Sequence, residues 1–411
     1  MRKPIKVLMF GWEFPPFNSG GLGTACLGLV QGLSDEDVEI TFVLPKKLDI
    51  ESPFAHLEFA DAYLPGVTVT AINSLLKPYV GSSAYKKMRD GEPEIYGLTL
   101  LEEVKLYALR AAELARNEAF DVIHAHDWLS FGAGLAAKHM SGKPFIAHVH
   151  ATEFDRTGGG ANKEIYEMEK YGMQEADVVV TVSDFTKRIV VDRYGIFPRK
   201  VHVIHNGIDI VPVGRSEGEQ EALRLKALKA SGKKIVLFVG RLTLQKGPDY
   251  FLRAARRVLE VYPDVYFVIA GSGDMEWQIM REAAWLGISD KVIFAGFLRG
   301  PELEGLYRAA DLYVMTSVSE PFGLTALEAM RNGTPVILSK QSGVSEVVHN
   351  ALKVDFWDID AIADAIVGML FHKPLAAEMR ENASKELPSL SWKHAARACI
   401  TIYKQLLYPL G

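Results

Sequence analysis

A short loop rich in glycine carries two cations whose spacing suits a diphosphate. The loop Gly240–Gly247 directly follows the apolar run Ile235–Val239, which has the composition of a buried strand. Arg241 and Lys246 lie five residues apart within it. A planar guanidinium can hold two phosphate oxygens at once, and a lysine ammonium supplies a mobile point charge. Both cations could instead be solvated residues ahead of a helix, so the loop alone leaves the two interpretations open.

Two glutamates further along the chain extend the hypothesis of a donor site. Pro321 and Gly323 mark a loop that opens into a predicted helix, whose free N–H groups and positive dipole end attract anions. Glu320 precedes this helix and Glu328 lies inside it, which separates the carboxylates by roughly 12 Å at ~1.5 Å per residue. Retaining glycosidases hold their carboxylates about 5–5.5 Å apart, so this pair is unsuited to hydrolysis. The spacing favours one carboxylate on sugar hydroxyls and the other on ribose; a helix cap plus an ordinary helix glutamate is the alternative.

The elements that must position these groups alternate along the whole chain. Short apolar runs are separated by longer amphipathic stretches, which is typical of parallel sheets covered by helices on both faces. An α/β fold is therefore predicted. The expected strands are Ile5–Phe10, Glu39–Leu44, Val67–Ile72, Val122–Ala125, Phe145–His148, Val178–Val182, Val201–Ile204, Lys234–Val239, Val265–Ala270, Val292–Phe294, Leu312–Met315 and Pro335–Leu338. The expected helices are Leu101–Arg116, Asn162–Gln174, Glu219–Lys229, Asp249–Val261, Asp274–Leu286, Pro301–Ala310, Thr325–Arg331, Ala361–Met369 and Trp392–Leu407.

The length of 411 residues exceeds one ordinary core and predicts two domains. We expect two Rossmann-like, doubly wound parallel-sheet domains that face each other across a cleft, because ligands bind at the carboxyl ends of strands in such folds. Residues 1–210 form the N-terminal, acceptor-side domain, and residues 211–390 form the C-terminal domain that holds the donor. Residues 391–411 form a C-terminal helix that crosses back to the N-terminal domain.

Composition and charge exclude several classes of protein. The net charge of -5 argues against nonspecific binding to nucleic acid or to an anionic membrane. The two cysteines, Cys26 and Cys399, make no disulfide framework and suit a reducing cytosol. The apolar run Ile5–Phe10 is too short for the core of a signal peptide, and no run of roughly 18 apolar residues is present to span a membrane. A cytoplasmic protein without a nucleic-acid partner or a transmembrane segment is predicted.

Four motifs together resemble the retaining glycosyltransferases of family four, which have the GT-B fold and include bacterial and archaeal glycogen synthases. They are EPFGLTALE from Glu320 to Glu328, GRLTLQKG from Gly240 to Gly247, Gly20-Gly21-Leu22-Gly23, and His205-Asn206-Gly207-Ile208-Asp209. The resemblance covers nearly the whole chain, with the motifs in the expected order. It implies transfer of a hexose, glucose above all, from a nucleotide diphosphate sugar to a sugar hydroxyl such as an α-glucan end, with retention at the anomeric carbon. It implies no cofactor beside the co-substrate, UDP-glucose or ADP-glucose.

The resemblance also implies roles for individual residues. Gly21 lies near the donor diphosphate, His150 approaches the donor hexose, Asp127 lines the acceptor side, and Arg156 belongs to a mobile acceptor-side loop. Attack on the same face of the sugar is implied, with a donor phosphate oxygen accepting the acceptor's proton. The residues expected in catalysis are His150, Arg241, Lys246 and Glu320. Those expected to bind the donor are Gly21, Arg241, Lys246, Glu320, Phe322, Gly323, Leu324, Thr325 and Glu328.

One position departs from the pattern of the family. Many bacterial glycogen synthases that use ADP-glucose carry a lysine two residues before the Gly20-Gly21 pair, and this chain has Asn18 there. The departure argues against ADP-glucose as the donor. The base of the nucleotide (UDP, ADP or GDP) and the hexose (glucose or mannose) remain alternatives.

Two His-x-His pairs raise the hypothesis of a metal site. His124 and His126 form one pair and His148 and His150 the other, each at a predicted strand, so that each pair shares a face and could hold zinc. No third or fourth ligand is evident, and for His124 and His148 a buried histidine satisfied by backbone partners is the simpler interpretation. The metal-binding letters Asp-x-Asp occur at 358–360, but they precede a predicted helix and are better explained as its cap. We therefore predict no metal.

Three other functions are set against the transferase. A hexosyltransferase acting on a lipid-linked or cell-envelope acceptor is the leading alternative, because Lys77–Arg89 is basic and aromatic enough for peripheral membrane contact. A silent nucleotide- or glucan-binding module is disfavoured by the complete set of cations and carboxylates. A dehydrogenase is disfavoured because Gly271-Ser272-Gly273-Asp274 lacks the third glycine of the dinucleotide fingerprint.

Overall fold

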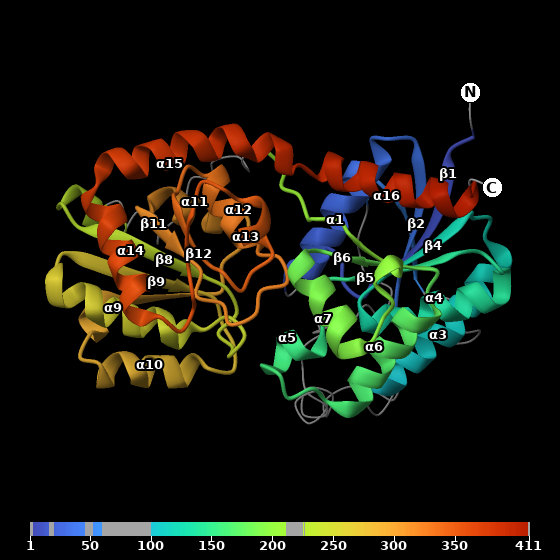
Figure 1. The fold of residues 1–411 in the computed structure, drawn as a ribbon, viewed down its shortest axis with the longest axis horizontal. Helices are drawn as coiled ribbons and strands as arrows, with labels where there is room; N and C mark the ends of the chain where they lie inside the picture. The colour runs from blue at the N-terminus through green and yellow to red at the C-terminus, as the bar shows by residue number, and fades with distance from the viewer. Residues whose placement is uncertain are drawn as a thin grey trace. The chain divides into compact units, whose positions relative to one another are not determined.

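Two parallel β-sheets organise the chain (Figure 1), and the predicted α/β fold with two parallel-sheet units is confirmed. A computed structural model describes residues 3–15, 20–45, 52–59, 100–210, 225 and 227–409. The contacts divide the chain into two units. The first comprises Met1–Glu153, Ala161–Gly207 and Trp392–Gly411, and the second comprises Phe154–Gly160 and Ile208–Ser391.

The sheet of the first unit has, among the described residues, seven strands in the order β3-β2-β1-β4-β5-β6-β7. All neighbouring strands run parallel. The central strands β4 and β5 are buried along their whole length, as their continuous apolar sequences predict. The strands are β1 (Ile5–Phe10), β2 (Val38–Leu44), β3 (His56–Phe59), β4 (Val122–His126), β5 (Phe145–Val149), β6 (Val178–Thr181) and β7 (Val201–Val203).

Helices cover both faces of this sheet. Phe145 of β5 packs beneath Gly134 of α4, whereas His124 of β4 hydrogen-bonds to Tyr403 of α16. Phe145 pairs with Ile123, and neighbouring residues of a strand point to opposite faces, so α4 and α16 cover opposite faces. The helices of the first unit are α1 (Gly21–Ser34), α3 (Leu100–Asn117), α4 (Trp128–Ser141), α6 (Lys163–Glu175), α7 (Asp184–Tyr194) and α16 (Trp392–Leu407). The short helix α5 (Glu153–Thr157) belongs to the second unit from Phe154 onward.

The last helix, α16, packs along α1 (Figure 1). Gly28 of α1 lies against the indole ring of Trp392, and a Cβ at this glycine would overlap that ring. One turn later, a Cβ at Gly32 would lie 2.7 Å from the carbonyl oxygen of Trp392. Glycine at these positions therefore allows the two helices to approach closely, and α16 carries Cys399 and Tyr403 into the core of the first unit.

Replacing Gly28 with alanine should destabilise the first unit. The same change inside a helix usually increases the stability of the folded state. Alanine normally favours a helix over glycine by about 0.5–1 kcal/mol. At Gly28 the overlap with Trp392 should reverse the sign, since overpacking costs about 1–3 kcal/mol. Gly132 of α4 is the matched control, because a Cβ there meets only the Cβ of Ala108 at 3.5 Å. Thermal unfolding should show a lower Tm for Gly28→Ala and an unchanged or higher Tm for Gly132→Ala; equal shifts would contradict the packing argument.

The second unit has, within the described ranges, a six-stranded parallel sheet in the order β10-β9-β8-β11-β12-β13. Its strands are β8 (Lys234–Val239), β9 (Val265–Ala270), β10 (Val292–Gly296), β11 (Leu312–Val314), β12 (Val336–Ser339) and β13 (Leu352–Val354). Its helices are α9 (Pro248–Val261), α10 (Glu276–Trp285), α11 (Pro301–Ala309), α12 (Leu324–Arg331), α13 (Val344–Val347), α14 (Ile359–Phe371) and α15 (Lys373–Glu386).

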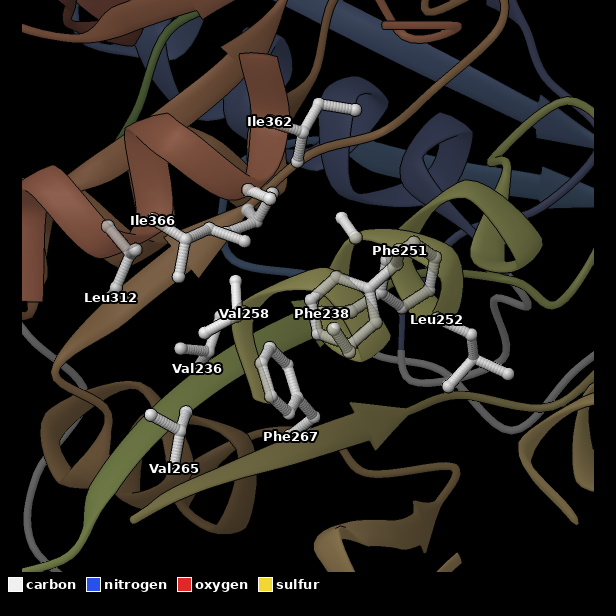
Figure 2. Packing of buried hydrophobic residues seen from close by; sticks show 14 of the residues in the cluster. Val236, Phe238, Phe251, Leu252, Val258, Val265, Phe267, Leu312, Ile362 and Ile366 are labelled. Carbon is white, nitrogen blue, oxygen red and sulfur yellow. The ribbon is translucent and has the colours of Figure 1, made fainter. Parts of the chain in front are cut away.

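The core of the second unit lies between β8, β9 and the helices α9 and α14 (Figure 2). The ring of Phe251 on α9 lies 5.5 Å from that of Phe238 and 5.7 Å from that of Phe267, measured between centroids. Ile362 and Ile366, one turn apart on α14, belong to the same buried cluster. The cluster draws on strand residues two apart and helix residues three or four apart, the spacings that place side chains on one face. This core supports β8, whose carboxyl end leads into the glycine-rich loop.

The structure differs from the predicted elements in a few places. Strands β3 and β13 and helices α1, α4, α5, α7, α13 and α15 were not predicted. The predicted helix cap is confirmed, because Asp358 Oδ1 accepts the N–H of Ala361 at 3.0 Å. The expected strand Val67–Ile72 and most of the expected helix Glu219–Lys229 lie outside the described residues. Of the helices that the structure describes, none combines the length and the apolar character that a membrane span requires.

Candidate active site

The loop Gly240–Gly247, here called the β8 loop, is held by the segment that follows β9. The N–H of Leu242 donates to the carbonyl oxygen of Ser272 at 3.0 Å. Gly271 has a φ of 145°, and a Cβ there would overlap the carbonyl oxygen of Gly240 at well under 3.0 Å. Only glycine allows the two backbones to approach this closely. The segment Gly271–Asp274, which lacks the third glycine of a dinucleotide-binding motif, thus determines the conformation of the β8 loop.

The β8 loop brings Lys246 against Glu320, which is 74 residues away in the sequence. Lys246 Nζ lies 2.5 Å from Glu320 Oε2, and Ser317 Oγ donates to the same oxygen at 3.1 Å. The exposed fraction is 24% for the lysine side chain and 7% for the glutamate side chain. The N–H of Val318 donates to the carbonyl oxygen of Gln245 at 2.9 Å, which ties the β8 loop to the loop after β11. Two residues predicted to handle the donor therefore form a partly buried ion pair.

The start of α12 lies next to this pair in the chain and is firmly held. Gly323 is its N-cap with a φ of 115°, and a Cβ there would lie 2.9 Å from Val344 Cγ1. Phe322 is buried, and its carbonyl oxygen accepts the N–H of Val344 at 2.7 Å. Thr325 Oγ1 forms a 2.8 Å hydrogen bond with the hydroxyl of Tyr313. The segment from Phe322 to Thr325 thus forms one helix start, where the first N–H groups and the helix dipole suit a phosphate.

Glu328 lies further along α12 and is held by a tyrosine that sequence reasoning missed. The hydroxyl of Tyr307, on α11, donates to Glu328 Oε2 at 3.0 Å. Burial raises the pKa of the Tyr307 phenol well above its usual range, so the group stays a donor. Burial also raises the pKa of the Glu328 carboxyl, and the Tyr307 hydrogen bond opposes that rise. A carboxylate fixed in this way presents its other oxygen in a constant direction.

The remaining predicted site residues, Arg241, Arg156 and Gly21, lie on three different elements of the structure. Arg241 opens the β8 loop and is partly exposed. Arg156 lies on α5 and is partly exposed, while its neighbour Asp155 is buried and accepts a hydrogen bond from Ser319 Oγ at 2.5 Å. Gly21 is the exposed first residue of α1 in the first unit.

Four histidines line one face of β4 and β5 in the first unit. His124 Nδ1 lies 2.7 Å from the hydroxyl of Tyr403 and its Nε2 lies 3.0 Å from His148 Nδ1, whereas His126 Nδ1 lies 2.9 Å from His150 Nε2. The prediction of buried histidines is confirmed, but their ring partners are one another and a tyrosine, not the backbone. Burial is the main cause that lowers the pKa of all four imidazoles, that of His150 to about 3, so they are neutral at physiological pH.

Asp127 holds the backbone that carries His150. Its Oδ1 accepts the N–H of His150 at 2.6 Å and that of Ala151 at 3.3 Å, and its own N–H donates to the carbonyl oxygen of His148 at 2.9 Å. Asp127 adopts a backbone φ of 60°, which residues other than glycine rarely do. The residue is buried, with 2% of its surface exposed. Such a conformation persists only where several contacts determine it. The aspartate predicted on the acceptor side is therefore also the residue that orients the loop after β5.

Two groups of potential metal ligands occur in the described part of the chain around these histidines. One is Cys26, His126 and His150, and the other is His124, His126 and His148, with the ligand atoms of each group within 4.8 Å of one another. Cys26 is the third ligand that the sequence did not reveal, because it comes from α1. Hydrogen bonds between neutral imidazoles account for the closest approaches, at 2.9 and 3.0 Å.

A buried carboxylate at the start of α1 also escaped sequence reasoning. Glu13 is 0% exposed, and its Oε1 accepts the N–H of Gly23 at 3.0 Å. The sequence does contain a signal for it, because Glu13 precedes the Gly20-Gly21 pair and carboxylates stabilise helix N-termini. Asn18 and the basic segment Lys77–Arg89, which carried the donor and membrane arguments, lie outside the described residues.

Comparison with known proteins agrees with this architecture. Residues 19–211 match the family model "Glycosyltransferase Family 4", and residues 219–386 match "Glycosyl transferases group 1". An uncharacterised glycosyltransferase of Methanocaldococcus jannaschii is 32% identical, over 99% of this chain and 100% of the relative. A glycogen synthase of Mycobacterium tuberculosis is 27% identical, over 97% of this chain and 94% of the relative.

A solved structure is similar over the same extent. The Anabaena protein HepE in complex with UDP-glucose has a TM-score of 0.71 and 18% identity, and the match covers 98% of this chain and 100% of that chain. Identity at this level bears on the fold alone, while the family rests on the sequence matches. The chain belongs to the family-four glycosyltransferases and is a glycosyltransferase with the GT-B fold.

Proposed function

We propose that this glycosyltransferase moves a hexose, glucose in the first instance, from a nucleotide diphosphate to a sugar hydroxyl with retention at the anomeric carbon. The ion pair of Lys246 and Glu320 is the observation that carries the proposal. An ammonium and a carboxylate at one point, beside a helix start, match a ligand that joins a phosphate to a sugar. In the proposed complex Lys246 turns to the diphosphate and Glu320 to the sugar hydroxyls.

The same group of residues would stabilise the leaving nucleotide diphosphate. Negative charge grows on the phosphate as its bond to the anomeric carbon breaks. Arg241, Lys246 and the N–H groups at the start of α12 supply positive charge and donors for it, and such electrostatic stabilisation is usually the largest catalytic effect. Glu328, fixed by Tyr307, would bind the ribose hydroxyls. The Gly21 end of α1 would approach the diphosphate as a second helix start.

The first unit would supply the contacts to the hexose and the acceptor. His150 would bind the donor hexose, with its backbone held by Asp127. In the proposed step, the bond from the anomeric carbon to the phosphate oxygen breaks while the bond to the acceptor oxygen forms on the same face. The acceptor proton passes to a donor phosphate oxygen, so no protein nucleophile is needed. Asp127 of the first unit and Arg156, which belongs to the second unit, would line the acceptor side.

A donor panel tests the proposal. UDP-, ADP- and GDP-glucose and the corresponding mannose donors are incubated with the chain, with and without glycogen, and nucleotide diphosphate release is measured. We expect release that is fastest with UDP-glucose and that rises when glycogen is added, with new α-linkages in the glycan by NMR. UDP-glucose is the first donor because the similar Anabaena protein was solved with it, and glycogen is the first acceptor because a relative is named a glycogen synthase. New β-linkages would contradict retention, and no release with any donor would contradict the proposed donor class.

A further inference from the structure

His126 and His150 form a buried imidazole pair at the ends of β4 and β5. His126 is 0% exposed and His150 is 9% exposed. His126 Nδ1 and His150 Nε2 lie 2.9 Å apart, a hydrogen-bond distance. Both residues belong to the first unit, so this contact does not depend on the placement of the second unit.

Only one of the two nitrogens can carry the proton in this bond. Burial lowers the pKa of both rings, so that each is a neutral imidazole with a single N–H. If His126 donates through Nδ1, its Nε2 is a bare lone pair and His150 carries its own proton at Nδ1. If His150 donates through Nε2, the proton of His126 must sit at Nε2. The presence or absence of a proton on His126 Nε2 is therefore coupled to the tautomer of His150.

His126 Nε2 is buried and has no hydrogen-bond partner within the part of the chain that the structure describes. A buried N–H without an acceptor is rarer in proteins than an unfilled acceptor, which favours the bare lone pair. The sulfur of Cys26 lies within 4.8 Å of one ring nitrogen of each histidine. Burial raises the pKa of the Cys26 thiol well above its usual range, so it stays an S–H group, a weak donor.

We propose that His126 is a positioning residue that holds His150 in the tautomer protonated at Nδ1, so that His150 meets the donor sugar as a hydrogen-bond donor. The part that concerns the sugar rests on the proposed function, whereas the tautomer itself does not. Two consecutive residues then share one task. Asp127 fixes the backbone of His150 through the 2.6 Å hydrogen bond, and His126 fixes the proton on its ring.

The tautomer can be measured without any ligand. Two-bond ¹⁵N–¹H correlation spectra of the chain labelled with ¹⁵N-histidine distinguish a protonated from a bare ring nitrogen. The His150 signals are assigned as those lost in His150→Gln. We expect a protonated Nδ1 and a bare Nε2 at His150. A wild-type spectrum with the proton on Nε2 would overturn the proposal, and this readout needs no variant of His126 to fold.

Two variants of nearly equal shape then separate the donor function of His126 from its packing. Asparagine places an amide N–H as many bonds from Cα as His126 Nδ1 does, whereas leucine has the same branching without a donor. The ratio of Kd for UDP to Kd for UDP-glucose reports the contacts to the hexose alone. We expect His126→Asn to keep both the tautomer and the ratio. His126→Leu should populate the other tautomer and lower the ratio about tenfold, as expected for loss of roughly 1.4 kcal/mol.

A control variant and the possible outcomes test the tautomer of His150 separately from the proposed donor function. His124→Asn is the control, because it alters the neighbouring histidine pair without touching the bond to His150, and it should leave the His150 spectrum unchanged. Equal Kd ratios in the wild type and in His126→Leu would overturn the role at the sugar. A wild-type chain that shows a protonated Nδ1 but binds no UDP-glucose would support the tautomer and contradict the proposed donor.

Discussion

Replacing Lys246 with methionine is expected to lower kcat/KM for the nucleotide-sugar donor by about a thousand-fold, mostly through kcat. Removal of one group that stabilises developing negative charge costs about a hundred- to a thousand-fold in kcat, and the leaving diphosphate carries a growing charge. Methionine keeps the unbranched stem of the lysine without the ammonium. Steady-state release of nucleotide diphosphate measures the effect. Turnover within threefold of the wild type would show that Lys246 does not serve the phosphate.

The ion pair complicates this test, because Lys246 also neutralises a buried carboxylate. With Lys246 gone, Glu320 retains the hydrogen bond from Ser317 Oγ but loses its cation. Breaking a fully buried pair costs about 3–5 kcal/mol, and the partial exposure of Lys246 should keep the loss below this range. The single variant should therefore unfold at a lower temperature as well as turn over slowly.

A double variant separates stability from catalysis. Glu320→Gln removes the uncompensated charge while keeping a group that can accept from Ser317. Lys246→Met combined with Glu320→Gln should recover most of the lost Tm and none of the lost turnover. Recovery of turnover in the double variant would mean that Lys246 acts only by neutralising Glu320.

Replacing Gly271 with alanine is expected to destabilise the second unit by about 2–6 kcal/mol and to impair the β8 loop. The new Cβ would overlap the carbonyl oxygen of Gly240, and the φ of 145° is strained for any residue with a side chain. Backbone strain of about 1–3 kcal/mol and overpacking of about 1–3 kcal/mol both contribute. Thermal or denaturant unfolding measures the loss. Relief of the overlap must shift the start of the β8 loop, and a displacement of about 1 Å at a reacting group can lower the rate about a hundred-fold.

Gly333 supplies the matched control in the same unit. It also has a positive φ, 76°, but a Cβ there would meet no atom within 4 Å in the described structure. Gly333→Ala should therefore carry only backbone strain, about 1–2 kcal/mol, and leave turnover unchanged. If the two alanine variants lost the same stability, the close approach of Gly271 to Gly240 would not be the cause.

The strands that the sequence did not predict share a position in the fold. β3 and β13 are the edge strands of their sheets, and neither is a long apolar run. A central strand is buried on both faces and therefore shows in its composition, whereas an edge strand is defined mainly by pairing with a neighbour. α1 escaped prediction for a different reason. Its glycines have the composition of a loop, and their presence in a helix is explained only by α16, whose Trp392 packs on Gly28.

The partners of the four buried histidines could be predicted from the sequence only in part. Spacing predicted that each His-x-His pair shares a face, which follows from the alternation of side chains in a strand. It did not predict that His124 would pair with Tyr403, 279 residues later, or that Cys26 would lie beside His126 and His150. These partners come from α16 and α1, and nothing near the histidines in the sequence encodes them.

The sequence by itself determined the α/β fold, the family, and which loops carry cations and carboxylates, because functional groups in doubly wound sheets follow the strands. For that reason the sequence alone places Lys246 and Glu320 in one predicted donor site. Only the tertiary structure decided that these two form an ion pair and that Gly271 shapes the β8 loop, which carries Lys246. It also decided that His126 Nδ1 lies within hydrogen-bond distance of His150 Nε2. Hydrogen-bond partners and protonation depend on burial and on contacts between distant segments, and these arise from packing rather than from any local pattern.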